Sequence, residues 1–435
     1  MKGTANLRRR ILSRRATVGV VGQGYVGVTL ACAAAEEGFS VVGVDLDAPR
    51  IEALASGKPA VPGVDEKLFR AGVETGRVRF TTDAGALQES EVILICVPTP
   101  LRDHAPDLSY VEGASREVAT HLRSNRLVVL ESTTYPGTTE EQVRPLLEAS
   151  GLVAGRDFLL AYSPERIDPG NPEYGLRNTP KLVAGHTPEA TGLANLFYAQ
   201  LVDKVVAMSS PRAAELSKLL ENTFRHVNIG LINEMATLCH EMGIDVWEVV
   251  EATATKPFGF MAFSPGPGVG GHCIPLDPTY LAWQVRRDAG RQFRILEEAQ
   301  EVNSQMPAWV AGRIGEALNE AGKAVKGARI YVLGVAYKPD VGDVRESPAL
   351  KVAEQLYRRG AELTFHDPHV EEIAVNGTRL RRTEITHRSI GKADCVALLT
   401  PHKDYDLPWL AENAALILDA RNAYGPDRRP NVVPL

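Results

Sequence analysis

The sequence has no apolar run long enough to cross a membrane and no excess of basic residues. Its longest apolar runs, such as VILICV at residues 92–97, have only the length of a strand. With 54 acidic and 48 basic residues, the net charge is −6. This balance argues against general nucleic-acid binding, which needs a positive field, but it leaves a local phosphate site open. We therefore expect neither a membrane nor a nucleic-acid partner.

Cysteine is scarce, odd in number and scattered, without any CxxC pair. This excludes a disulfide framework and a structural zinc site, predicts no bound metal and fits a reducing cytoplasm. The five cysteines are Cys32, Cys96, Cys239, Cys273 and Cys395. Four of them lie in helical or strand patterns and are expected to be inert core residues.

Cys273 differs, because it stands in the stretch GPGVGGHCIPLDP at residues 266–278. Glycine and proline are too dense there for a helix or a strand, so a loop is predicted. Small side chains let a ligand approach the backbone closely. His272 beside it has no further spaced ligands, which argues against a metal site. Cys273 is a candidate nucleophile.

Residues 1–15 carry five arginines and one lysine. No apolar stretch typical of a targeting peptide follows them. We expect a basic N-terminal arm that is solvated and frayed, and we assign it no function.

Two parts of the chain alternate short β-branched runs with helical patterns. The first begins at residue 16 with ATVGVVG and recurs at 92–97 and 127–133; the second begins at residue 328 with ARIYVLGVAYK. Strands that alternate with helices predict parallel sheets with helices on both faces. A turn of the form GxGxxG is present only in the first part.

Between these parts, a helix is predicted from Pro211 to about Met242, with Ser210 as its cap and Gly243 as its stop. Its apolar residues go most of the way round, which predicts burial on several sides, a spine between two domains and a subunit interface. The fold class is thus α/β, with two Rossmann-like doubly wound domains joined by a long central helix. The expected boundaries are 16–207 for the first domain, 208–322 for a central helical domain with the cysteine loop, and 323–435 for the second Rossmann-like domain.

The turn GQGYVG (Gly22, Gly24, Gly27) lies between a predicted strand and a predicted helix, which is the arrangement that binds a dinucleotide pyrophosphate. Asp45 ends the next predicted strand, 18 residues beyond Gly27. A carboxylate there binds a ribose 2′-hydroxyl and repels a 2′-phosphate, so NAD is predicted rather than NADP. Asp47 is a poorer alternative because it lies beyond that strand.

Lys218 and Asn222 lie four residues apart, on one face of the predicted central helix. Together they can stabilise a developing oxyanion, although such a pair is more often a solvated stripe.

Four motifs taken together resemble the UDP-glucose/GDP-mannose dehydrogenase family across almost the whole chain: GGHCIPLDP, GQGYVG, SPERIDPG and AELSKLLENTFR. The resemblance implies an NAD-binding N-terminal domain, a central helix that makes a homodimer or a higher oligomer, and a C-terminal UDP-binding domain. It also implies oxidation of the C6 alcohol of a UDP-sugar to a carboxylate with two NAD per turnover, through a thiohemiacetal and a thioester on Cys273.

The resemblance further implies roles for individual residues. Lys218 and Asn222 would stabilise oxyanions, Asp277 and Thr133 would position water or a lysine proton, and Glu165 would be the acid/base of thioester hydrolysis. The remaining cofactor contacts implied are Gly22, Gly24, Tyr25, Val26, Gly27, Asp45, Arg50, Thr99, Thr133 and Arg345. The substrate contacts implied are Glu165, Lys218, Asn222, Lys256, Gly268, Gly270, Tyr337, Lys338 and Arg421.

Two departures from the family pattern bear on the substrate. Leu276 stands where UDP-glucose enzymes have a lysine, and Pro169 stands where some members have a second glutamate. The form HCIPxDP resembles enzymes of UDP-2-acetamido sugars. The stretch KPFGFMAFSPGPG at 256–268 is most similar to the UDP-N-acetylglucosamine 6-dehydrogenases, whose product is a precursor of surface polysaccharide.

Three alternatives stay open. UDP-N-acetylmannosamine or UDP-glucose would change only the sugar. A non-catalytic sensor of NAD and nucleotide sugars is a different class, and a redox sensor built on Cys273 would need a resolving cysteine, of which none is near in sequence.

Overall fold

The computed structural model describes residues 2–103, 105–168, 171, 173–271, 274–426 and 428–435. Cys273 and His272 therefore lie outside the described residues. By the density of internal contacts the chain divides into two compact units. The first holds residues 1–221 and 279–284, and the second holds residues 222–278 and 285–435.

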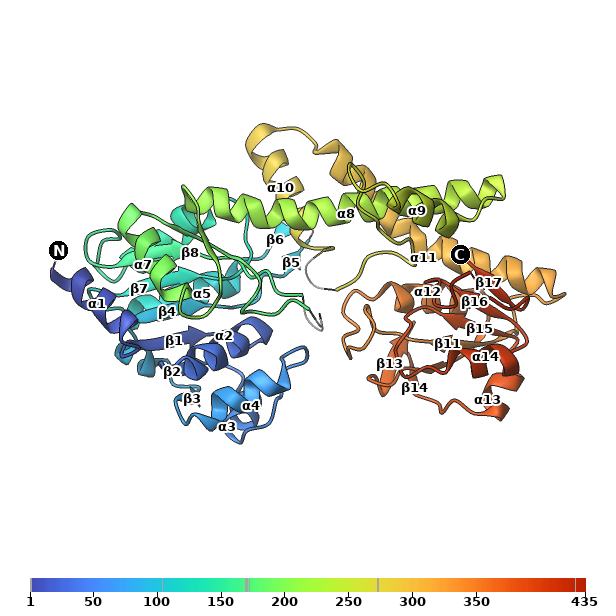
Figure 1. Ribbon diagram of the computed structural model, residues 1–435, viewed down its shortest axis with the longest axis horizontal. Helices are drawn as coiled ribbons and strands as arrows, with labels where there is room; N and C mark the ends of the chain where they lie inside the picture. Colours follow the sequence, from blue (N-terminus) through green and yellow to red (C-terminus); the bar gives the residue numbers. More distant parts are fainter. Residues whose placement is uncertain (1, 104, 169–170, 172, 272–273, 427) are drawn as a thin grey trace. The chain divides into compact units, whose positions relative to one another are not determined.

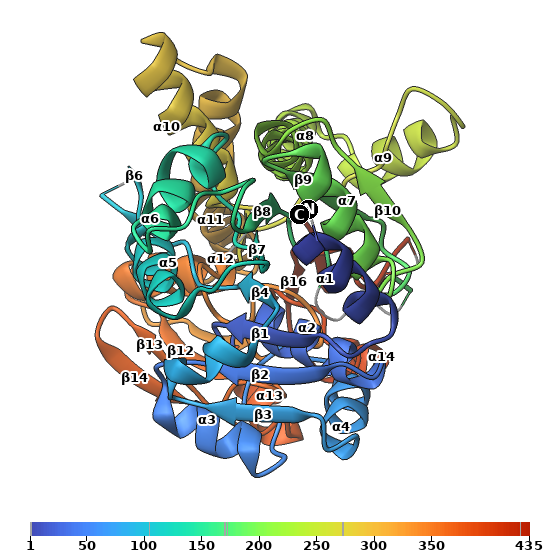
Figure 2. The ribbon, with the colours of Figure 1, turned by 90° about the vertical axis from the view of Figure 1, so that its left-hand side faces the viewer.

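An eight-stranded sheet forms the centre of the first unit (Figures 1 and 2). In sheet order its strands are β10 (Val205–Ala207), β9 (Lys181–Gly185), β8 (Leu159–Tyr162), β7 (Leu127–Leu130), β4 (Val92–Ile95), β1 (Thr17–Val21), β2 (Ser40–Val44) and β3 (Val78–Thr81). The six strands from β8 to β3 run parallel in the Rossmann order, whereas β9 is antiparallel to β8.

Helices cover both faces of this sheet, as the alternating sequence pattern predicts. One face packs against α1 (Lys2–Leu12), α2 (Tyr25–Glu36) and α7 (Pro188–Tyr198). The other packs against η1 (Ala84–Glu89), α5 (Ser109–His121) and α6 (Arg144–Glu148). The unit also contains α3 (Ala48–Ala55), α4 (Glu66–Glu74), the π-helical turn η2 (Thr139–Val143) and the hairpin β5 (Leu101–Arg102) and β6 (Ala105–Pro106). Strands β4, β7 and β8 are buried throughout because both of their faces are covered.

The prediction of a frayed N-terminal arm is wrong. Residues 2–12 form helix α1, and Leu7 and Ile11, which are one helical turn apart, are 2% and 0% exposed in the core of the first unit. Arg10 pairs with Glu91 at 2.6 Å. The basic residues dominate the composition, but the apolar pair decides the structure because its burial stabilises a packed helix.

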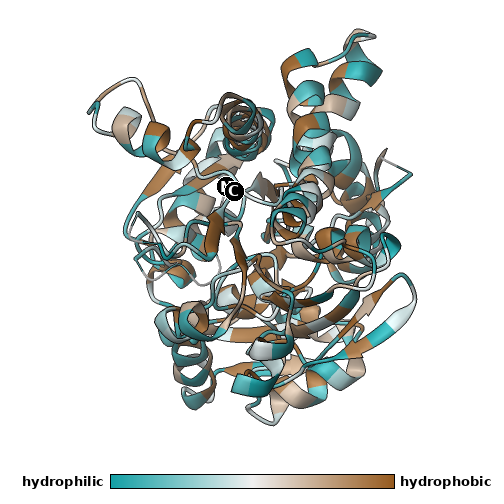
Figure 3. Ribbon diagram, turned by 90° about the vertical axis from the view of Figure 1, so that its right-hand side faces the viewer, coloured by the Kyte–Doolittle hydropathy of each residue, from teal (hydrophilic) through white to brown (hydrophobic). Residues whose placement is uncertain are grey.

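A five-stranded parallel sheet forms the centre of the second unit, in the order β12 (Glu362–His366), β11 (Arg329–Leu333), β15 (Cys395–Leu398), β16 (Ile417–Asp419) and β17 (Val432–Pro434). Helices α11 (Arg294–Glu320) and α12 (Pro348–Arg358) pack on one face. Helices α13 (His387–Lys392) and α14 (Leu407–Asn413) pack on the other. A hairpin of β13 (Glu372–Val375) and β14 (Thr378–Arg381) completes this region. Figure 3 shows hydrophobic residues concentrated in the strands, whereas the helices carry both hydrophobic and polar residues.

The long central helix α8 spans Pro211–Met242, as predicted. Ser210 accepts the Ala213 N–H at 3.2 Å through its hydroxyl, and Gly243 follows the last turn with φ +68°. Its apolar residues are not buried all round in the single chain, contrary to expectation. The exposed ones are Leu216, Leu220, Phe224, Leu231, Leu238 and Met242. Helices α9 (Val246–Ala254) and α10 (Asp277–Ala289) complete the described helices.

Candidate functional site

The glycine-rich turn joins β1 to α2 and fits a dinucleotide pyrophosphate. Gly22 has φ +91°, and a Cβ there would meet the Cys96 carbonyl oxygen at 2.6 Å. A Cβ on Gly24 would meet nothing within 4 Å, so space is open beside the turn. Helix α2 has no side-chain cap, which leaves its first N–H groups available to an anion. Tyr25 and Val26 form its first turn.

Asp45 follows β2 directly and faces the same turn. Its carboxylate accepts the Gln23 N–H at 2.6 Å and the Asp47 N–H at 2.9 Å. Arg50 lies 3.2 Å from the Asp45 carboxylate and 3.1 Å from that of Asp47. Asp47 itself caps α3 by accepting the Arg50 N–H. The predicted adenosine-side residues are thus together in the first unit, and Asp47 has a structural role in the helix start.

Thr99 and Thr133 follow β4 and β7 at the carboxyl edge of the sheet, where open α/β sheets bind their ligands. The Thr99 carbonyl accepts the Tyr280 hydroxyl. The segment after Thr133 is fixed by Glu215 of α8, which is fully buried. Its carboxylate accepts the Gly137 N–H at 2.6 Å and the Thr139 N–H at 2.9 Å. Glu215 therefore ties this segment to α8 one turn before Lys218, a contact that the sequence analysis missed.

Glu165 lies in the loop after β8, and backbone contacts orient its carboxylate. One oxygen accepts the N–H groups of Arg166 at 2.7 Å and Ile167 at 2.6 Å. The other lies 3.6 Å from the ammonium of Lys181. Arg166 pairs with Glu221 of α8 at 2.7 Å, which anchors the loop to that helix.

Three polar residues of the predicted catalytic group are buried, and buried polar side chains normally have hydrogen-bond partners. Lys218, Asn222 and Asp277 are 8%, 5% and 5% exposed. Within the second unit, the Asn222 side-chain amide donates to the Asp277 carboxylate. Asp277 and Pro278 open helix α10, so the last two residues of the predicted loop are helical instead. Proline fits there because the first helical N–H has no partner within the helix.

The loop before Cys273 packs against the segment that follows β11. A Cβ on Gly270 would meet Pro348 at 2.7 Å, and a Cβ on Gly271 would meet the Tyr337 ring at 2.9 Å. Gly271 also has φ +86° and donates its N–H to the Arg345 carbonyl at 3.2 Å. Gly268 has φ +121°. The glycines are therefore required because neighbouring chain segments occupy the space of a side chain.

Both flanks of the loop contact buried polar residues of α8 and α11. The Gly266 N–H donates to Asn233 at 3.0 Å, and Asn233 donates to Asn303 at 2.9 Å. Asn303 contacts the His226 ring at 3.4 Å. Burial lowers the pKa of His226 to about 4, and the backbone of Ile274 acts in the opposite direction. This chain of contacts was not predicted, because asparagines on a long helix resemble a solvated face.

The remaining predicted substrate residues, and the predicted cofactor contact Arg345, belong to the second unit. Arg421 donates to the Leu399 carbonyl at 3.2 Å, and its guanidinium lies against Gly266. Burial lowers the pKa of Arg421 to about 10. Lys338 follows Tyr337 in the same turn, and Arg345 pairs with Asp343 at 2.6 Å. Lys256 is exposed, and its ammonium lies 5.0 Å from the centre of the Phe258 ring.

Among the described residues, one group has the spacing of metal ligands: Asp340, His369 and His402. Contacts within the protein already engage His402 and Asp340. One ring nitrogen of His402 accepts the Asp340 N–H at 2.9 Å, and the other lies 3.0 Å from Asp367. Asp340 pairs with Lys403 at 3.0 Å.

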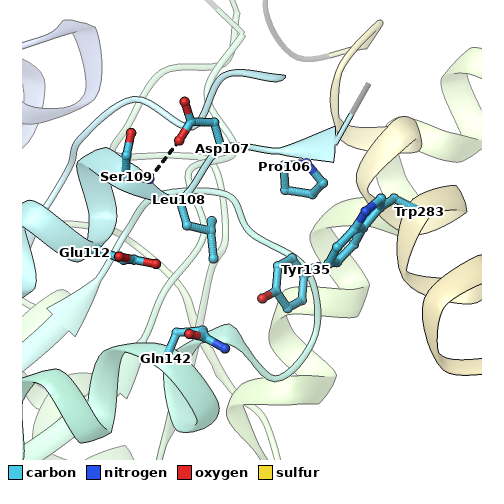
Figure 4. A pocket seen from close by; sticks show the side chains of 8 residues that line it. All are labelled: Pro106, Asp107, Leu108, Ser109, Glu112, Tyr135, Gln142 and Trp283. Atoms are coloured by element: carbon cyan, nitrogen blue, oxygen red, sulfur yellow. Dashed lines mark hydrogen bonds between the residues drawn. The ribbon is translucent and has the colours of Figure 1, made fainter. Parts of the chain in front are cut away.

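A hollow of about 310 Å³ lies beside the segment after Thr133 (Figure 4). It is lined by Pro106, Asp107, Leu108, Ser109, Glu112, Tyr135, Gln142 and Trp283. The rings of Tyr135 and Trp283 lie 5.2 Å apart. The lining has two carboxylates and no cation, so it does not suit a nucleotide phosphate, and none of the predicted site residues lines it.

The four described cysteines are buried, as predicted for core residues. Burial raises the pKa of the Cys32 and Cys395 thiols to about 12, which leaves them protonated and unreactive at neutral pH. None of the described helices is both long and apolar enough to span a bilayer.

Comparison with known proteins matches the chain to three domains of one family. The NAD binding domain, central domain and UDP binding domain of the UDP-glucose/GDP-mannose dehydrogenase family match residues 16–202, 212–305 and 331–426. The chain belongs to this family. It is an NAD-dependent oxidoreductase that acts on a UDP-sugar.

Several family members are similar over nearly their whole length. UDP-N-acetyl-D-mannosamine dehydrogenase of Pyrococcus horikoshii is 36% identical over 416 residues, covering 93% of this chain and 95% of that protein. Protein CapL of Staphylococcus aureus is 34% identical, covering 94% and 96%. The solved structure of the P. horikoshii UDP-D-ManNAc dehydrogenase covers 96% of this chain and 98% of its own, with a TM-score of 0.87 and 34% identity. A Methanosarcina mazei NDP-N-acetyl-D-galactosaminuronic acid dehydrogenase structure covers 98% and 97%, with a TM-score of 0.79 and 30% identity.

Proposed function

We propose that this family member oxidises C6 of a UDP-2-acetamido-hexose to a carboxylate, with UDP-N-acetylmannosamine as its substrate. Two observations together carry this proposal: the chain belongs to the family, and its cysteine motif has the form HCIPLDP, which resembles that of enzymes acting on UDP-2-acetamido sugars. The substrate of the similar P. horikoshii enzyme favours the manno configuration. UDP-N-acetylglucosamine is the second candidate, because the stretch at 256–268 favours it.

We assign the first steps to Cys273 and to Lys218 and Asn222 of the central helix. NAD held at the glycine turn by Gly22, Gly24 and Asp45 would supply the hydride acceptor for each of the two oxidations, and the proton of the C6 oxygen would leave to water each time. Cys273 adds to the aldehyde and forms a thiohemiacetal, which the second oxidation converts to a thioester. Lys218 and Asn222 stabilise the oxyanions, and Asp277 orients the Asn222 amide through their hydrogen bond.

Hydrolysis completes the turnover. Glu165 takes a proton from water as the water oxygen attacks the thioester carbonyl, the C–S bond breaks, and Cys273 leaves as a thiolate. Thr133 helps to position that water. The nucleotide is held by Tyr337, Lys338 and Arg421, where cations and a hydroxyl suit the UDP phosphates. The product is a UDP-2-acetamido-hexuronate, a building block for surface polysaccharide.

We also propose that a second copy of the chain covers the exposed apolar side chains of α8, which makes the enzyme a homodimer or a higher oligomer. Leu220 and Leu231 are 60% and 59% exposed in the single chain. Large apolar side chains exposed along one helix are typical of a protein–protein interface.

The test is the stoichiometry of NADH formed from limiting amounts of each UDP-sugar. We expect two NADH per UDP-N-acetylmannosamine and little from UDP-N-acetylglucosamine or UDP-glucose. Two NADH from another sugar would keep the mechanism and overturn the substrate. One NADH per sugar would overturn the thioester route, and binding without oxidation would favour a sensor.

A further inference from the structure

Beneath the carboxyl edge of the first sheet lies a buried ion pair that the proposed chemistry does not use. Lys181 begins β9 and its side chain is 3% exposed; Glu131 follows β7 and its side chain is fully buried. Their charged atoms lie 2.6 Å apart. The Tyr198 hydroxyl donates to Glu131, and the Pro164 carbonyl accepts from the Lys181 ammonium at 3.1 Å.

The same ammonium faces the Glu165 carboxylate. Its nitrogen lies 3.6 Å from one Glu165 oxygen, an oxygen that is buried and has no hydrogen-bond partner among the described residues. The other oxygen is held by two backbone N–H groups. A buried carboxylate oxygen without a donor costs free energy unless a nearby charge stabilises it.

We propose that Lys181 is a positioning residue for the reaction, which faces the negative charge of the Glu165 carboxylate and orients that carboxylate for proton transfer while Glu131 holds the ammonium. This inference rests on the proposed role of Glu165. Lys181 does not touch the substrate, because its ammonium is enclosed by Glu131, Glu165 and the Pro164 carbonyl.

The charges around the ammonium are consistent with this role. Burial lowers the pKa of Lys181, but Glu131 and Glu165 outweigh burial, so the pKa lies above its ordinary value and the ammonium stays charged. The other titratable groups near it are Cys96 after β4 and Tyr198 on α7, and burial raises the pKa of both. The carboxylates of Glu131 and Glu165 therefore share one cation. Removing the charge of Lys181 or of Glu131 changes the electrostatic potential at the Glu165 carboxylate.

The experiment compares Lys181→Met with Glu131→Gln. The measured quantity is the pH at the midpoint of the acid limb of the kcat profile. The rate is taken in the steady state that follows the first two hydride transfers. Lys181→Met should move the limb to higher pH by about one to three units, because the nearby cation is lost. Glu131→Gln should move it to lower pH, because the ammonium then acts on Glu165 alone. Shifts in the same direction, or slower turnover with an unmoved limb, would overturn the proposal.

Lys181→Met leaves a buried carboxylate without its cation and can weaken the fold. The double variant Lys181→Met/Glu131→Gln removes both charges at similar volume, so its thermal midpoint should exceed that of Lys181→Met. Its limb should nevertheless lie at higher pH than that of Glu131→Gln, because the two variants differ only in the Lys181 charge. A limb at the same pH in both would show that Lys181 acts only through stability.

Glu165→Gln, measured in parallel, separates this inference from the proposed function. It should release two NADH per active site and then stall as the thioester. Continued turnover would refute the role of Glu165 itself, whatever the Lys181 variants do.

Discussion

Asp45 faces the glycine turn with a carboxylate that already accepts two backbone N–H groups and pairs with Arg50. These contacts fix its orientation before a cofactor arrives. A carboxylate so fixed favours a ribose 2′-hydroxyl over a 2′-phosphate.

Asp45→Asn should therefore lower the preference for NAD over NADP, measured as the ratio of kcat/KM values. A charge-assisted hydrogen bond contributes about 1.5–3 kcal/mol, which corresponds to roughly a 10- to 100-fold change. Asp47→Asn is the matched control, because Asp47 also pairs with Arg50 but caps α3. An equal loss of preference in both variants would assign the effect to Arg50.

His226 makes stability depend on pH. Its pKa is near 4 in the folded protein because the ring is buried, against an ordinary value of 6.5. The unfolded chain then binds the extra proton first as pH falls, so the contribution of His226 is fully present above about pH 6.5 and is lost towards pH 4. Between pH 7.5 and pH 5, we expect a loss of about 2 kcal/mol from this residue.

His226→Gln should flatten that dependence, measured as the urea midpoint of the second unit at the two pH values. Gln keeps a polar group near Asn303 but does not titrate. An unchanged slope would mean that His226 is solvated in the native protein.

At the scale of elements, the loop before Cys273 is shaped by what packs against it. Gly270 and Gly271 admit Pro348 and Tyr337 at distances that exclude a side chain. The polar contacts of Gly266 with α8 add a second constraint. Glycine and proline in the sequence predict the loop, whereas its partners come from segments far along the chain.

Gly271→Ala should lower kcat by about tenfold or more, because its Cβ displaces the Tyr337 ring and shifts the loop that leads to Cys273, the proposed nucleophile. Gly290→Ala is the matched control: Gly290 also has a positive φ, +61°, but open space around its Cβ position. It should cost about 1 kcal/mol of stability and little activity. Equal losses of kcat would assign the effect to backbone strain alone.

At the scale of the whole molecule, helix α8 belongs to both units and carries apolar side chains that the single chain leaves exposed. From the sequence, the many apolar residues of this helix predict that it is buried on several sides. A single chain leaves several of them exposed, and under the proposal a second copy of the chain covers them.

Leu220→Asp should shift the mass measured by light scattering from the oligomer towards the monomer. A charge at a buried apolar contact costs several kcal/mol, enough to weaken association by a factor of about 100 or more. Val153→Asp, at an exposed apolar residue in a different part of the chain, should leave the mass unchanged. A monomeric wild type would refute the proposed interface.

The sequence by itself determined both Rossmann-like sheets, the bounds of α8, the glycine turn with Asp45 and the inert character of the four buried cysteines. These features depend on local periodicity, turn residues and caps, which act between neighbours along the chain. It failed for α1, where the arginines of the basic N-terminal segment obscured the apolar pair Leu7 and Ile11.

Only the tertiary structure decided the contacts between residues distant in sequence. Glu131 and Lys181 are 50 positions apart, Asn233 and Asn303 are 70 apart, and Glu215 reaches back 78 positions to Gly137. In the sequence, each of these residues resembles a solvated polar residue. Their contacts matter because the residues are buried: a charge or an amide removed from water must find its partner within the fold.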